Sequence, residues 1–173
     1  MNSVDFKNKN KESEDNLLVR PKLRSYSKIL AEHKRLSLIE DYPSDFTGKT
    51  IDEIASFLGI KDKKPAIFQT PIEIVKIYKS NILHMNPQKD STRILGLSRA
   101  VRTLIKPSIV IQDKKENYYI KFFKKLSVDK IHLQVIRTTK KDGFYKTNFP
   151  MSKNRFENMK GQIIYDLSSK RGN

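Results

Sequence analysis

The sequence contains no cysteine. This excludes disulfide bonds and every zinc or iron–sulfur site that needs thiolate ligands, and it fits an intracellular place of action. No stretch approaches the about 18 consecutive apolar residues of a membrane-spanning helix. The polar N-terminus has no apolar segment of the kind found in secretory signals. We therefore expect a cytoplasmic protein without a membrane span, and delivery by another route stays open.

Acidic residues are missing between Asp90 and Asp113, and basic residues outnumber them throughout the second part of the chain. Residues 1–45 hold nine Lys and Arg against eight Asp and Glu, whereas residues 46–173 hold 26 against 11, and the net charge is +16. In the second part the charges alternate with apolar residues at helix and strand spacing, which indicates a folded basic domain. Such a domain attracts polyanions, so nucleic acid is the first partner to test.

Several signatures of known chemistry are also absent. The sequence has no P-loop, no GxGxxG, no HExxH and no paired-carboxylate motif for two-metal nuclease chemistry. The aromatic signature of RNA-recognition motifs and the spacing of zinc fingers are absent as well. We therefore expect neither a metal nor a cofactor.

The chain divides into two predicted parts. Residues 1–45 are expected to form a flexible N-terminal arm with one amphipathic helix over about residues 25–40, which packs on the domain or on another molecule. Residues 46–173 are expected to form a basic α+β domain of the nucleic-acid-binding or nuclease-like kind. This second part is long enough to bury a core of its own.

Three helices are predicted at the start of the domain. Residues 50–53 form a capping box, and Gly59 marks the end of the helix that follows. A second box at residues 70–73 has proline at the first helical position and predicts a helix to about residue 83. The apolar spacing over residues 91–105 predicts the third helix.

The remainder of the domain has the two-residue period of strands. Strands are predicted at residues 118–123, 131–135, 143–149 and 162–165, with a short helix over residues 152–160. Asp142 and Gly143 form a tight-turn signal that joins the second and third of these strands in a hairpin. Helices followed by an antiparallel sheet of about four strands give an α+β fold.

The order of these pieces is similar to that of a known superfamily. His84 follows a helix, a Lys-Pro turn at residues 106–107 precedes the meander, Thr147 lies in a strand, and residues 160–165 close the chain segment. Over roughly residues 70–166 this layout resembles the barnase–EndoU–colicin–RelE superfamily of metal-independent ribonucleases, in particular its phage-borne and polymorphic-toxin branches.

The resemblance implies a toxin-type endoribonuclease that cleaves RNA, such as tRNA or mRNA, by attack of the 2′-hydroxyl on the adjacent phosphate. It makes His84 a candidate acid or base, Thr147 a candidate phosphate-contacting hydroxyl and Arg93 a candidate for binding the charge of the transition state. It also implies an acidic immunity or antitoxin protein, and delivery into a target cell or packaging with a phage. The chain departs from the barnase pattern because no clear catalytic glutamate lies on a strand: Glu116 resembles a turn residue.

The base is therefore unassigned unless a histidine serves. His132 is the candidate substitute, because histidine titrates near neutral pH without perturbation. Both histidines have a structural alternative: His84 can cap the end of its helix, and His132 can be a partly exposed residue on a polar strand face.

Three cations lie three and four residues apart on one predicted helix face, namely Arg99, Arg102 and Lys106. A solvated helix face normally mixes charges of both signs, and this one lies in the stretch without acids, so phosphate contact is a candidate role. The alternative is an ordinary solvated face.

The predicted sheet supplies further candidate contacts with nucleic acid, namely Lys121, Tyr145 and Lys146. Simple alternation places Tyr145, Thr147 and Phe149 on one face, where a tyrosine can stack on a base, although most aromatic residues are expected in the core. A second hypothesis for the whole chain needs no catalysis. It is a phage or mobile-element accessory protein that binds nucleic acid or a protein partner through its basic face.

Overall fold

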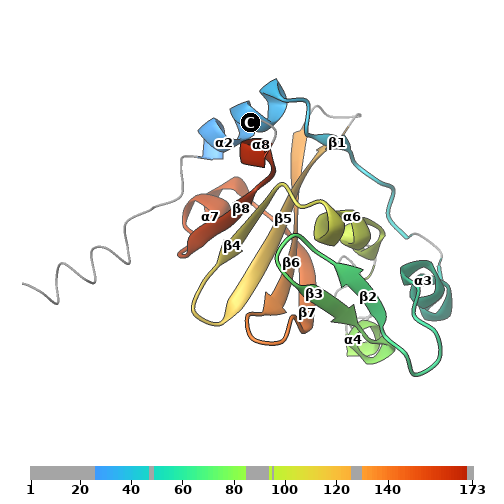
Figure 1. Ribbon diagram of the computed structural model, residues 1–173. Coiled ribbons are helices and arrows are strands. Elements are labelled where there is room, and N and C mark those ends of the chain that lie inside the picture. The colour runs from blue at the N-terminus through green and yellow to red at the C-terminus, as the bar shows by residue number, and fades with distance from the viewer. Residues whose placement is uncertain (1–25, 47–48, 85–93, 95, 126–129, 171–173) are drawn as a thin grey trace, which may run out of the picture.

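A computed structural model describes residues 26–46, 49–84, 94, 96–125 and 130–170 of the chain (Figure 1). Its helices are α2 (Tyr26–Arg35), α3 (Ile51–Leu58), α4 (Lys79–His84), the 3₁₀ helix η1 (Gly96–Arg99), α6 (Ala100–Ile105), α7 (Lys153–Glu157) and α8 (Leu167–Lys170). Its strands are β1 (Glu40–Asp41), β2 (Ala66–Gln69), β3 (Ile74–Ile77), β4 (Ile109–Gln112), β5 (Glu116–Lys125), β6 (Lys130–Thr139), β7 (Tyr145–Met151) and β8 (Gln162–Asp166). The fold is α+β.

The centre of the fold is a curved sheet in the order β7-β6-β5-β4-β8, whose neighbours are all antiparallel. The short strand β1 is the sixth member and pairs parallel with the end of β5. A separate ribbon consists of β2 and β3. None of the helices in the described part of the chain is long and apolar enough to cross a membrane.

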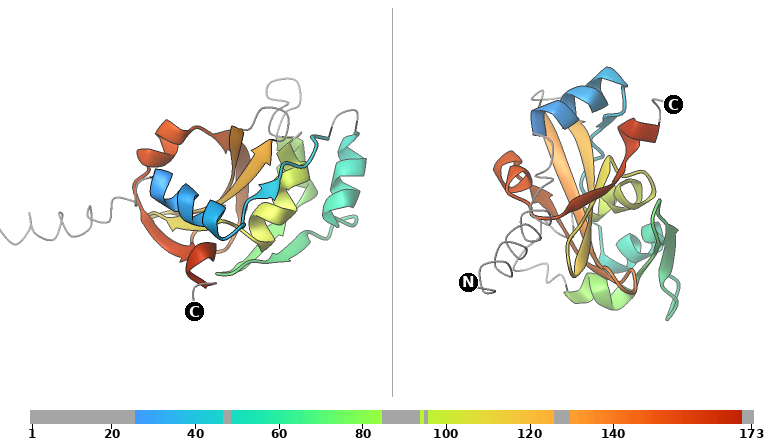
Figure 2. Two further views of the ribbon diagram at one scale, coloured as in Figure 1. Left: turned by 90° about the horizontal axis from the view of Figure 1, so that it is seen from above. Right: turned by 60° about the vertical axis from the view of Figure 1, so that its left-hand side comes forward.

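The two faces of the curved sheet are covered differently (Figure 2). On the convex side, which we call the outer face, Tyr119, Ile136 and Tyr145 pack with residues of α3, α6 and the ribbon. On the concave side, the inner face, Phe122 and Val135 pack with residues of α2 and α7. Burying a large apolar side chain contributes about 1.5–3 kcal/mol, so the two cores hold the sheet from both sides.

The first predicted helix start is confirmed. The Thr50 side chain accepts from the backbone N–H of Glu53, and the Glu53 carboxylate accepts from the backbone N–H of Thr50. Gly59 ends α3 in the left-handed conformation that favours glycine. Local side-chain chemistry alone was enough to predict these boundaries.

The helix predicted from residue 72 to about residue 83 is wrong over its first half. Thr70 does accept from the backbone N–H of Glu73, but this turn joins β2 to β3, and a helix begins only with α4. The Glu73 carboxylate does not complete the box, because it accepts from the Tyr119 hydroxyl at 2.6 Å. Val75 faces the core while Ile74 is exposed, which is the two-residue period of a strand.

The predicted sheet of about four strands was too small. The strands expected at residues 118–123, 131–135, 143–149 and 162–165 correspond to β5, β6, β7 and β8, and the helix expected at residues 152–160 corresponds to α7. The sequence prediction missed β4, a four-residue run whose first three residues are buried, and β1, which has two residues. Segments this short carry no readable period. The third predicted helix is α6 preceded by η1, and most of residues 91–95 lie outside the described part.

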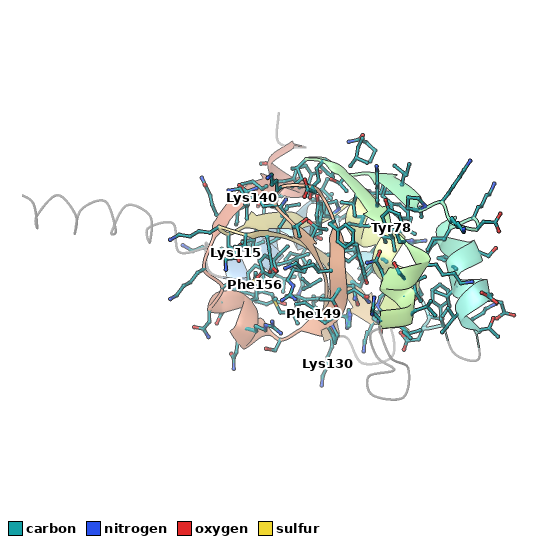
Figure 3. The ribbon with its side chains drawn as sticks, turned by 90° about the horizontal axis from the view of Figure 1, so that it is seen from below. Tyr78, Lys115, Lys130, Lys140, Phe149 and Phe156 are labelled. Carbon is teal, nitrogen blue, oxygen red and sulfur yellow. The ribbon has the colours of Figure 1, made fainter. Side chains whose placement is uncertain are left out.

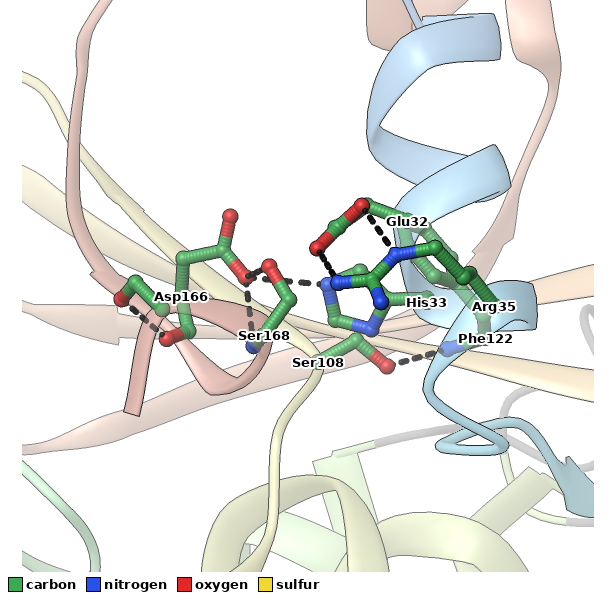
Figure 4. Close-up of polar contacts among 8 residues, drawn as sticks. Glu32, His33, Arg35, Ser108, Phe122, Asp166 and Ser168 are labelled. Atoms are coloured by element: carbon green, nitrogen blue, oxygen red, sulfur yellow. Dashed lines mark hydrogen bonds and ion pairs between the residues drawn. The ribbon is translucent and has the colours of Figure 1, made fainter. Parts of the chain in front are cut away.

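Residues 26–45, which the sequence assigned to the arm, lie against the sheet. Tyr26, Ile29 and His33 of α2 are buried on the inner face. The His33 Nε2 atom lies 3.0 Å from an Asp166 carboxylate oxygen that also accepts from the backbone N–H and the hydroxyl of Ser168 (Figure 4). Burial alone would raise the pKa of Asp166, but these hydrogen bonds outweigh it and lower the pKa. Helix α2 is thereby connected to the last strand of the sheet.

Candidate functional site

The predicted phosphate-binding face on α6 is occupied by acids from the N-terminal segment. Arg99 is only 3% exposed, and it lies at the start of α6 rather than on a solvated face. Its Nε donates to Gln134 at 2.9 Å, its Nη1 pairs with Asp45, and its guanidinium lies 4.3 Å from the centre of the Tyr42 ring. Arg99 therefore supports the packing of residues 42–45 on the outer face.

The other cations of this face converge on Glu40. The Glu40 carboxylate lies 3.3 Å from Arg102 Nη1, 3.8 Å from Lys106 Nζ and 3.2 Å from Lys121 Nζ. Lys121 is fully buried and also donates to the Lys106 carbonyl oxygen at 2.6 Å. Burial lowers the pKa of Lys121. One acid that is distant in sequence is thus shared by three cations and offsets part of their charge.

His132 lies on the outer face in a packed environment. Its Nε2 is 2.9 Å from the Gln134 side-chain oxygen, and its ring centre is 4.7 Å from that of Tyr42 in an edge-on arrangement. Burial lowers the pKa of His132 to about 4, so the ring is neutral at pH 7. Because its strand partner is Phe123 while Thr147 pairs with Arg137, His132 and Thr147 lie on opposite faces. They cannot act on one phosphate.

No described contact brings His84 or Tyr145 to the cations of α6 or to His132. His84 is exposed at the end of α4, which contacts β7 through the Asn81 side chain and the Tyr145 carbonyl oxygen. Tyr145 is fully buried on the outer face. Arg93 lies outside the described residues.

A β-bulge at Lys146 explains why simple alternation failed in β7. Tyr145 pairs with Thr138 and Thr147 pairs with the adjacent Arg137, so Lys146 is an extra residue in the strand. The bulge places Tyr145 on the outer face and Thr147 on the inner face, although the two are separated by one residue. It also lets Lys146 reach Glu116 at 2.6 Å.

The bulge brings several polar side chains together on the inner face. We call this group the inner polar cluster, and its members are Glu116, Tyr118, Arg137, Lys146 and Thr147. Tyr118, Arg137 and Thr147 are direct partners across β5, β6 and β7. Directly opposed side chains on neighbouring strands have Cβ atoms about 4.5–5.5 Å apart, so the three form one row.

Glu116 is the carboxylate of this cluster, and its side chain is 13% exposed. It accepts from Lys146 Nζ at 2.6 Å and from the Tyr118 hydroxyl at 3.0 Å, and it lies 3.4 Å from Arg137 Nε. Burial alone would raise the pKa of Glu116, but the hydrogen bonds from Lys146 and Tyr118 and the charge of Arg137 outweigh it and lower the pKa. Burial and the Glu116 carboxylate raise the pKa of Tyr118 to about 12. At pH 7 the cluster therefore holds an ionised carboxylate and a protonated tyrosine.

Two donors of the cluster are not satisfied within the protein. The Thr147 hydroxyl and the Arg137 Nε are buried, and neither has a hydrogen-bond partner among the described residues. Nearly all buried polar groups in proteins have such partners. An anion placed in the row would accept from both donors beside the Glu116 carboxylate.

Sequence reasoning found only part of this cluster. It named Thr147 and Lys146, set Glu116 aside as a turn residue, and did not name Tyr118 or Arg137 as site residues. Glu116 is in fact the first residue of β5, with its backbone N–H bonded to the Asp113 side chain. The one available signal was the alternation of β6, which continues from Leu133 to Arg137 on a single face.

Comparison with known proteins supplies no family for this chain. Neither the family models, nor the curated proteins, nor the solved structures contain a match. Among the described residues, no group of three or more His, Asp or Glu side chains is arranged to hold a metal ion.

Proposed function

We propose that the protein is a metal-independent endoribonuclease whose site is the inner polar cluster. One observation carries the proposal: an ionised carboxylate lies between the cations of Arg137 and Lys146, next to the buried Thr147 hydroxyl, which has no hydrogen-bond partner among the described residues. Phosphodiester transesterification needs a base, positive charge and hydrogen-bond donors for the phosphate oxygens. The cluster offers each of these groups on one face of a rigid sheet.

The proposed roles follow from the chemistry of each side chain. Glu116 accepts the proton of the 2′-hydroxyl, whose oxygen attacks the adjacent phosphorus. Arg137, Lys146 and the Thr147 hydroxyl stabilise the negative charge on the phosphate oxygens. The bond from phosphorus to the 5′-oxygen breaks, and that oxygen takes up a proton, which leaves a 2′,3′-cyclic phosphate. Glu116 thereby takes the role of base that the sequence left unassigned.

The resemblance points to His84 as the proton donor, but its helix α4 packs on the outer face through Ile82. In this proposal the leaving oxygen therefore takes its proton from water. The substrate is proposed to be RNA such as tRNA or mRNA, and the net charge of +16 favours its capture. The same charge favours an acidic protein inhibitor of the immunity or antitoxin type.

The test is cleavage of end-labelled RNA in EDTA by the wild type and by Glu116→Gln. Removing a general base typically costs about 10²- to 10⁴-fold in rate, and Glu116→Gln should fall in this range without loss of folded structure by circular dichroism. Glu157→Gln is the matched control, because Glu157 is exposed on α7 and its replacement changes the net charge equally.

Cleavage by Glu116→Gln at the wild-type rate would remove the assignment. RNA binding by a wild-type protein that leaves the RNA intact would favour the second hypothesis, a non-enzymatic accessory protein. Its support is that Glu116 and both cations of the cluster already pair with one another, as expected of a purely structural network.

A further inference from the structure

An aromatic ring and a guanidinium lie next to the inner polar cluster. Phe149 of β7 is half-buried on the inner face, as Figure 3 shows, where it packs at the edge of the core. The Arg155 guanidinium of α7 lies 4.6 Å from the centre of this ring. Arg155 is itself exposed, so its guanidinium is accessible to solvent beside the ring.

This pair has a fixed relation to the proposed phosphate position. Phe149 follows Thr147 by two residues in β7, and both lie on the inner face, because their partners in β6 are Val135 and Arg137. Two residues of a strand span about 6.6–6.8 Å. The pair of Phe149 and Arg155 therefore lies within the reach of one nucleotide from the Thr147 hydroxyl, which has no hydrogen-bond partner in the described part of the chain.

We propose that Arg155, supported by Phe149, is a stacking subsite for one unpaired nucleobase of a single-stranded RNA. This inference rests on the proposed function only for the position of the phosphate. Nucleobases stack on aromatic rings and on arginine guanidinium planes in proteins that bind single-stranded RNA. A base laid on the exposed side of Arg155 continues the stack that begins at Phe149.

The proposed subsite distinguishes unpaired from paired nucleotides and does not distinguish one base from another. Every base presents a π-face, so stacking tolerates all four bases. A base within a duplex has both faces covered and cannot enter the stack without leaving the helix. The substrate class is therefore single-stranded RNA or an unpaired loop.

The test measures the binding of a single-stranded 2′-O-methyl oligonucleotide by fluorescence anisotropy. This ligand lacks the attacking hydroxyl, so binding is measured whether or not the protein cleaves RNA. Arg155→Lys is the central variant, because lysine keeps the charge and lacks the plane. We expect it to weaken binding about 5- to 150-fold, the range for losing one stacked base. Lys153→Gln is the matched control, since it removes a charge from the same helix without touching Phe149.

A second ligand separates stacking from other contacts. A set of oligonucleotides carries one abasic position, which is moved along the strand from one member to the next. We expect one member to bind the wild type more weakly than the intact oligonucleotide does. The Arg155→Lys variant should bind this member and the intact oligonucleotide equally. Phe149→Leu should behave like Arg155→Lys. Wild-type affinity in Arg155→Lys, or an equal abasic penalty in wild type and variant, would overturn the subsite. Loss of cleavage in Glu116→Gln with the abasic pattern retained would support both proposals independently.

Discussion

The outer and inner faces of the sheet differ in how their buried cations are paired. On the outer face Lys121, which is fully buried, and the nearly buried Arg99 have their charges balanced by Glu40 and Asp45. On the inner face Thr147 and Arg137 keep donors without hydrogen-bond partners in the described structure. Leaving a buried donor unpaired costs about 1–3 kcal/mol. The outer face has one such donor in the described structure, the Gln134 Nε2, whereas the inner face has two beside an ionised carboxylate, which makes the inner face the better candidate for ligand binding.

The largest effect is expected from removing the acid that balances the outer face. Glu40→Gln leaves the buried Lys121 ammonium without a counter-charge, which should lower the free energy of unfolding by about 2–4 kcal/mol. Urea denaturation measures it. Glu32→Gln breaks an exposed ion pair with Arg35 and should leave the midpoint unchanged. Equal losses in both variants would show that the outer face is not held by this buried pair.

A fall in pH should lower the free energy of unfolding, because His132 is half-buried on the outer face as a neutral ring. Its pKa is about 4 in the folded protein and about 6.5 when unfolded, so the unfolded chain binds more protons between these values. The stability that neutral His132 provides is full above pH 6.5 and is lost as the pH falls toward 4, by about 3 kcal/mol. His132→Gln should flatten the dependence of the urea midpoint on pH in this window. A wild-type slope in that variant would contradict the burial of a neutral ring.

The same substitution of threonine by valine can be made on each face, at Thr138 and at Thr147. Thr138 on the outer face donates to the Glu73 carboxylate at 3.1 Å, so Thr138→Val should lower the free energy of unfolding by about 1.5–3 kcal/mol. Thr147→Val removes an unpaired hydroxyl, so thermal melting should show unchanged or slightly raised stability. The same Thr147→Val variant should slow RNA cleavage about 10²-fold, the cost of losing one donor to the transition state. If Thr147→Val were destabilised and kept full activity, Thr147 would have a structural role like that of Thr138 and no role in cleavage.

The smallest effect is a shift in the pH–rate profile of the inner face. The hydrogen bond from Lys146 lowers the pKa of Glu116, so Lys146→Met should raise that pKa. Because the proposed base works ionised, the acid limb of the cleavage profile should move to higher pH. Lys140→Met, at the exposed turn after β6, is the control and should not move the limb. An unmoved limb in Lys146→Met would separate Glu116 from the proton transfer.

Features with local causes were predictable from the sequence. The α+β class, the capping of α3 and the strands β5 to β8 each follow from capping residues or from two-residue alternation within about ten residues. Where local signals competed with tertiary contacts, the prediction failed. The turn at residues 70–73 carries a helix-start pattern, yet Glu73 bonds to Tyr119 from β5 and the chain continues as a strand.

The candidate site was only partly predictable, for two physical reasons. One extra residue in β7 reverses the face of Tyr145 relative to Thr147, and a bulge leaves no mark in the alternation read from sequence. The pairing of Glu116 with Arg137 and Lys146 depends on the register of β5, β6 and β7. Register is a property of strand pairing and is not encoded in any one of the three segments.

Composition and local pattern determined that this chain is a basic α+β protein, without cysteine, whose positive charge lies on folded structure. Tertiary structure decided which of these positive charges are paired with acidic side chains. Glu40 and Asp45 are more than fifty residues from the arginines they neutralise, and Coulomb attraction depends on distance in space rather than in sequence. Folding therefore placed two acids beside the helix face that the sequence favoured and assembled another cluster on the opposite side of the sheet.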